Sequence, residues 1–81
     1  MITYFLYLMD ELNKPFYCDS IATSITDNEE LKRLVAEKLK RVISLNPKAC
    51  YLTIERYIDD ELVPLFRKDL KTGKWKEVER Q

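Results

Sequence analysis

The sequence predicts an α+β fold in which one helix packs on one face of a mostly antiparallel sheet of four to five strands. One long segment, residues 28–45, has its apolar residues at helical spacing, and the segments on both sides of it are short apolar or alternating runs bounded by turn residues. The expected order is strand, strand, helix, strand, strand, strand. Because 81 residues suffice for one modest core, we expect a single compact domain over residues 1–81.

The first two strands are expected before the helix. Residues 2–9 are apolar at almost every position, which is typical of a strand that is covered on both faces. The polar residues 10–14 and Pro15 then indicate a turn. Residues 16–21 are therefore predicted to return as a short second strand.

The helix is predicted from its cap, its periodicity and its stop. Asp27 can cap the first turn while Glu30, three residues later, reaches back to the cap, so the helix is expected to begin near Asn28. Pro47 predicts an end near residue 44 or 45. The apolar stripe consists of Leu31, Leu34, Val35, Leu39, Val42 and Ile43.

Residues 49–67 alternate between apolar and polar positions, which predicts two strands around an acidic turn at residues 59–61. The register that keeps one face apolar pairs Ile58 with Leu62, Ile54 with Phe66 and Arg56 with Pro64. Because Pro64 has no N–H, its strand is expected to be an edge or to contain a bulge there.

The last stretch predicts one more hairpin, with a turn over residues 70–72 and the only glycine, Gly73, at positive φ. In that register Phe66 faces Val78, and Arg67 faces Glu77. Lys71-Thr72-Gly73 resembles a β-lactamase signature, but no serine is followed by lysine at the third position. Gly73-Lys74 likewise lacks the earlier glycine of a phosphate loop.

Composition excludes several classes of function. Fourteen basic and fourteen acidic residues cancel, which argues against binding nucleic acid or anionic membrane by bulk charge. There is no histidine, and Cys18 and Cys50 are too far apart for a zinc or redox motif, so we expect no metal, no cofactor and no enzymatic activity. The apolar run of residues 2–9 is too short for a membrane span, and we expect a cytoplasmic protein with buried free thiols.

Function is expected on the sheet face that the helix leaves uncovered. In the predicted register the helix covers Leu52, Ile54, Ile58, Leu62, Phe66 and Val78. The opposite face is expected to hold the partner-binding residues, namely Tyr51, Tyr57, Val63, Leu65, Trp75 and Arg67. This pattern favours a non-enzymatic protein-binding module of the inhibitor, adaptor or subunit type, binding another protein or forming a homodimer through this face and a free strand edge.

Two alternatives stay open at this point. The loop of residues 10–26 could fold under the sheet and make a second small core. The chain could also be a single-stranded nucleic-acid binder that stacks bases on Tyr51, Tyr57 or Trp75. In that case the phosphates would be held by Arg67, Lys68, Lys71, Lys74 and Lys76. The small size and the lack of motifs suggest an inhibitor encoded by a phage or mobile element.

Overall fold

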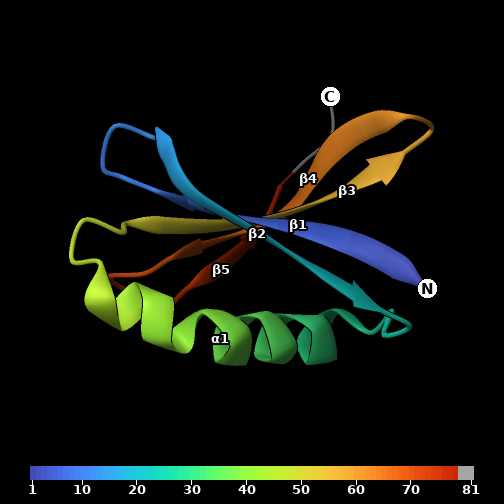
Figure 1. Ribbon diagram of the computed structural model, residues 1–81, viewed down its shortest axis with the longest axis horizontal. Coiled ribbons are helices and arrows are strands. Elements are labelled where there is room, and N and C mark those ends of the chain that lie inside the picture. The colour runs from blue at the N-terminus through green and yellow to red at the C-terminus, as the bar shows by residue number, and fades with distance from the viewer. Residues whose placement is uncertain (79–81) are drawn as a thin grey trace.

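The computed structural model, which describes residues 1–78, confirms the α+β fold and the order of its elements. Residues 79–81 of the predicted domain lie outside the described residues. The elements are β1 (Ile2–Met9), β2 (Pro15–Thr23), α1 (Asn28–Leu45), β3 (Tyr51–Ile58), β4 (Glu61–Asp69) and β5 (Trp75–Glu77). The strands form one sheet in the order β2-β1-β3-β4-β5 with antiparallel neighbours, and α1 lies along one of its faces (Figure 1).

The strand predicted at residues 16–21 is present and longer, because β2 pairs with β1 over almost its full length. The turn between them is held by Asp10, whose Oδ1 accepts the N–H groups of Leu12 and Lys14 at 2.9 and 3.0 Å. This turn rises from the sheet, and residues 15–23 form an edge strand. The alternative in which residues 10–26 fold under the sheet is therefore wrong.

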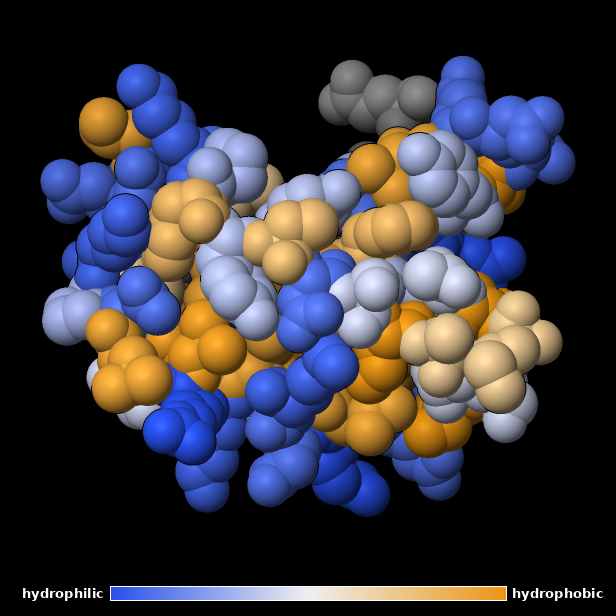
Figure 2. Space-filling model, viewed as in Figure 1, coloured by the Kyte–Doolittle hydropathy of each residue, from blue (hydrophilic) through white to orange (hydrophobic). Residues whose placement is uncertain are grey.

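Helix α1 begins and ends where its sequence signals place it. The Asp27 carboxylate accepts the Glu30 N–H at 3.0 Å, which satisfies one of the N–H groups that a helix leaves without an internal partner. The buried helix residues are Leu31, Val35 and Leu39, and they form one core with Tyr4, Leu6, Leu8, Leu52, Ile54 and Phe66. Figure 2 shows hydrophobic side chains along the boundary between the sheet and the helix.

The register between β3 and β4 differs from the prediction near the turn. Asp59 and Asp60 both have positive φ, 51° and 65°, and close a two-residue turn of the type that suits a hairpin. Ile58 consequently pairs with Glu61, and the predicted pairs of Ile58 with Leu62 and of Arg56 with Pro64 are wrong. A bulge opposite Ile54 and Glu55, at Pro64 and the next residue, restores the register.

The bulge has two consequences for the sheet. Beyond it Ile54 pairs with Phe66, as predicted, and the expectation of an irregularity at Pro64 is confirmed. Between the bulge and the turn, the side chains of β4 lie on the face opposite to the predicted one. Val63 is buried on the helix side, with 7% of its surface exposed, and Leu62 is 38% exposed on the other side.

The last hairpin is also one residue out of the predicted register. Gly73 has a φ of 75°, as expected, but the turn spans four residues because the Asp69 carboxylate accepts the N–H groups of Lys71 and Thr72. The observed pairs are Phe66 with Glu77, Arg67 with Lys76 and Lys68 with Trp75, so the predicted pairs of Phe66 with Val78 and of Arg67 with Glu77 are wrong. Trp75 thereby lies on the helix side of the sheet.

Candidate interaction surface on the open sheet face

The sheet face away from α1 is not covered by any other described element, and we call it the open face (Figure 1). The turn of residues 10–14 rises above one end of this face, and the β3–β4 turn rises above the other. Figure 2 shows that the surface between these two ends is hollowed. By the strand pairing, the residues on this face include Phe5, Tyr7, Met9, Tyr51, Thr53, Glu55, Tyr57 and Arg67.

Aromatic rings gather near the β3–β4 turn. Phe5 of β1 and Tyr57 of β3 meet edge to face, with 5.6 Å between the ring centroids and an angle of 89° between the planes. Tyr57 is 57% exposed, although it is held by this contact, while Phe5 and Tyr7 are partly buried. The rings therefore form a fixed aromatic surface that solvent can reach.

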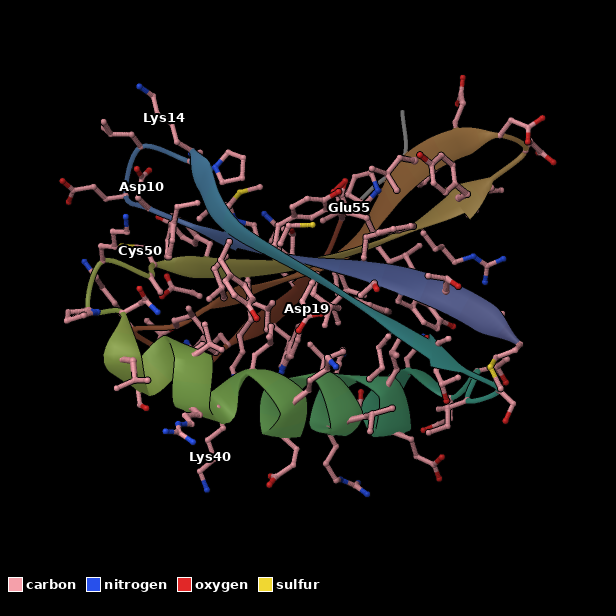
Figure 3. All side chains as sticks on the ribbon, viewed as in Figure 1. Asp10, Lys14, Asp19, Lys40, Cys50 and Glu55 are labelled. Atoms are coloured by element: carbon pink, nitrogen blue, oxygen red, sulfur yellow. The ribbon has the colours of Figure 1, made fainter. Side chains whose placement is uncertain are left out.

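Glu55 lies in the middle of these rings. It is paired across the sheet with Phe5 on one side and Pro64 on the other, and Figure 3 shows it on the side of the sheet away from α1, between the two raised ends. Within residues 1–78 its carboxylate has no hydrogen-bond or ion-pair partner. Burial among apolar neighbours raises the pKa of the Glu55 carboxyl above its ordinary value.

Thr53 precedes Glu55 by two residues on the same face and is almost fully buried, with 6% of its surface exposed. Its hydroxyl has no hydrogen-bond partner among the described residues. A buried hydroxyl without a partner is unfavourable, because it has given up its hydrogen bonds to water. The centre of the open face thus holds two polar groups, those of Thr53 and Glu55, that the described fold leaves without partners.

The other end of the open face carries a fixed cation. The Arg67 guanidinium lies over the Tyr51 ring, 3.9 Å from the centroid, and donates a hydrogen bond to the Asn13 side-chain oxygen. Beside it is a shallow hollow of about 530 Å³ lined by Tyr51, Arg67, Asp69, Thr72, Lys74, Trp75 and Lys76. The open face is therefore acidic and aromatic toward the β3–β4 turn and basic toward β5.

The structure brings only part of the predicted site together. Tyr51, Tyr57 and Arg67 lie on the open face, whereas Val63 lies on the helix side and Leu65, at the bulge, packs against the core. The prediction that Trp75 lies beside Tyr57 is wrong because of the register of the last hairpin.

Trp75 instead packs against the core from β5, on the side of the sheet that α1 covers. The ammonium groups of Lys32 and Lys68 lie 5.7 and 5.5 Å from the centre of its ring. Both cations come from the covered side of the sheet, Lys32 from α1 and Lys68 from β4. The indole therefore has a structural environment on the helix side, although Trp75 also lines the hollow beside Arg67.

Phe5, Tyr7 and Glu55 were not among the predicted partner-binding residues, although the alternation of residues 2–9 already puts Phe5 and Tyr7 together on one face of their strand. The alternation of residues 51–58 places Glu55 on the same side as Tyr51 and Tyr57, which is a signal that can be read from the sequence. The pairing of β1 with β3, which brings Phe5 beside Glu55, joins segments about 50 residues apart and has no local signal.

Other candidate chemistry is limited within the described residues. Cys50 is buried, as predicted, but Cys18 is exposed on β2, where it pairs with Tyr7, and neither forms a disulfide. Burial, followed by the influence of Cys18 and Glu55, raises the pKa of the Tyr7 phenol. Residues 1–78 contain no cluster of three or more potential metal ligands, and α1 is not apolar enough to cross a membrane.

The open face is thus a hollowed surface that holds aromatic rings, a partly buried carboxyl at its centre and, toward β5, a guanidinium over a tyrosine ring. Comparison with known proteins gives no relative from which a role for this surface can be inferred. No known protein family, curated protein or solved structure significantly matches this chain.

Proposed function

We propose that this chain is a non-enzymatic protein-binding module that holds its partner on the open face. The observation that carries this proposal is the arrangement around Glu55, in which a partly buried carboxyl without a partner in residues 1–78 lies beside the contacting rings of Phe5 and Tyr57 on a hollowed surface. Rings that are already fixed lose little conformational freedom on binding, and tyrosine is among the residues that dominate protein interfaces.

The sheet edges extend this surface. β2 and β5 are the outer strands of the sheet, and β2 is nine residues long with no lysine to discourage pairing. A partner that reaches over the open face toward β2 could add a strand there, as in other complexes formed by strand addition. Asp19 lies at the middle of β2 on the helix side, 3.8 Å from Lys38, so it does not obstruct the open face.

Affinity capture followed by reconstitution tests this proposal. A protein captured from an extract of the source cells is purified, and its affinity is measured by calorimetry for the native chain, for Tyr57→Ser and for Leu45→Ser. Leu45 is a matched control, because it is 68% exposed and lies at the end of α1, away from the open face. We expect Tyr57→Ser to weaken binding at least tenfold, which corresponds to about 1.4 kcal/mol, and Leu45→Ser to have no effect.

Equal affinities for the native chain and Tyr57→Ser would place the interface elsewhere. A second copy of the chain is one partner of this kind, and light scattering at two concentrations tests it directly. In that case Tyr57→Ser should convert the dimer into a monomer, whereas Leu45→Ser should not.

Single-stranded nucleic acid is the second candidate, and the hollow beside Tyr51, Arg67, Lys74 and Lys76 favours it. Against it, Trp75 is turned to the helix side, and Glu55 would repel phosphates along the open face. Titration of fluorescent single-stranded oligonucleotides at low salt decides between the two proposals. Binding that weakens steeply with salt and is lost in Arg67→Gln would favour the nucleic-acid function.

A further inference from the structure

The surroundings of Glu55 restrict the chemistry of the group that covers it. The carboxyl is flanked across the strands by Phe5 and Pro64, and along β3 by Thr53 and Tyr57. Within the described chain no cation or hydrogen-bond donor reaches it. Any partner that covers the open face will remove more water from this carboxyl, which makes its ionised form still less favourable unless the partner supplies a counter-charge.

Three kinds of partner group can be compared at this position. A phosphate or carboxylate would be repelled by Glu55, and an apolar side chain would bury the carboxyl without a partner. A lysine or arginine side chain would supply the counter-charge, while its aliphatic stem and its charged end would both fit against aromatic rings. The basic side chain is therefore the group that satisfies both the carboxyl and the rings.

The open face already contains one contact of this kind. The Arg67 guanidinium lies over the Tyr51 ring, 3.9 Å from the centroid, and its Nη2 donates a hydrogen bond to the Asn13 side-chain oxygen. The guanidinium thus uses a ring below it and an acceptor beside it. Phe5 and Tyr57 with Glu55 repeat this combination of ring and oxygen acceptor, and no cation from residues 1–78 pairs with the Glu55 carboxylate.

We propose that the partner inserts a lysine or arginine side chain into the open face, where its charged end pairs with Glu55 and its stem lies against Phe5 and Tyr57. This inference rests on the proposed protein-binding function and specifies what the partner must present. It predicts that a basic side chain is the central anchor of the partner's binding surface, surrounded by apolar contacts to the rings.

The proposal fixes the sign of the pH dependence of binding. Cation binding requires ionised Glu55, so affinity should rise as the pH increases from 4 to 7 and then level off. The other titratable or charged groups on this face are Tyr7, Cys18, Tyr51, Tyr57, Arg67, Asp69 and Lys76. The pH dependence that belongs to Glu55 is therefore the part that Glu55→Gln removes. If protonated Glu55 instead donated a hydrogen bond to a partner carbonyl, affinity would fall over the same range.

The test uses Nα-acetyl-arginine methylamide as the probe and the citrulline derivative as its neutral isostere. Binding is followed by the backbone amide NMR signals of Phe5, Glu55 and Tyr57. We expect the arginine probe to shift these signals, with millimolar or weaker affinity, and the citrulline probe to bind at least fivefold more weakly. Glu55→Gln should reduce the affinity for the arginine probe about tenfold, while Glu37→Gln, the same change on the exposed side of α1, should not.

The inference is overturned if the arginine probe leaves these signals unmoved, if it binds no better than citrulline, or if Glu55→Gln binds it as well as the native chain. Measurements on the reconstituted complex separate this failure from that of the proposed function. A complex weakened by Tyr57→Ser but not by Glu55→Gln refutes the basic anchor alone, whereas one that is weakened by neither refutes the open face as the interface.

Discussion

Replacing Thr53 by valine should stabilise the free protein, although most substitutions in a core do the opposite. The Thr53 hydroxyl is buried in the central strand β3 and has no hydrogen-bond partner within the described chain. Burial of a hydroxyl without compensation costs about 1–3 kcal/mol in protein mutational data. Valine has nearly the same shape, exchanges the hydroxyl for a methyl group and suits a strand equally well. We therefore expect a gain of about 1–2 kcal/mol.

The assay is urea unfolding with the midpoint and slope both measured, together with a thermal melt. For a domain of this size, each kcal/mol should raise the Tm by about 4–8 °C. Thr23→Val provides the matched control, because the Thr23 hydroxyl accepts the Ile25 N–H at 3.1 Å. The same substitution should destabilise there, by about 0.5–1 kcal/mol. A loss of stability in Thr53→Val would refute the reasoning, since it would mean that the hydroxyl is hydrogen-bonded in solution.

Three further predictions concern the pH dependence, the helix cap and the last turn. Because burial raises the pKa of Glu55 in the folded state, the free energy of unfolding should fall as the pH rises through that pKa. In urea unfolding, Glu55→Gln should therefore be only slightly more stable than the native chain near pH 4 and clearly more stable at pH 7. The same pH dependence of stability in both proteins would contradict this. Asp27→Ala should cost about 1 kcal/mol by removing the acceptor of the Glu30 N–H, as measured by the thermal midpoint, whereas Asp27→Ser should cost much less. Gly73→Ala should cost about 1 kcal/mol from positive φ alone, because no atom lies within 4 Å of the added Cβ; Gly73→Asn should cost less, and equal losses for both would argue for a steric cause.

The elements of this fold could be predicted from the sequence because each has a local signal. The helix has a capping residue, an apolar stripe and a proline shortly after its end, and its observed bounds, Asn28–Leu45, follow these signals. The strands are marked by apolar or alternating runs between turn residues. Local signals do not give the length of a turn to within one residue, and the two hairpin registers depended on that length.

The errors in the predicted site follow from these turns. The β3–β4 turn has two residues, Asp59 and Asp60, where three were expected. The β4–β5 turn, which is held by Asp69, has four residues where three were expected. Because side chains alternate along a strand, a shift of one residue moves each of them to the opposite face. Val63 and Trp75 moved to the helix side in this way, while Tyr51 and Tyr57, on a strand whose alternation was read correctly, remained on the open face.

Stability and binding can be separated on the open face through Thr53 and Glu55, the two polar groups that have no partner within residues 1–78. Thr53 is covered by its neighbours, so Thr53→Val should stabilise the chain without changing its affinity for a partner. Glu55 is only partly buried and within reach of a partner, so Glu55→Gln should stabilise the free chain at neutral pH and weaken its complex. If the open face had no partner, both substitutions would raise the stability of the chain without weakening any complex. A carboxyl that lowers the stability of the free chain but strengthens the complex is the behaviour expected of a group retained for binding.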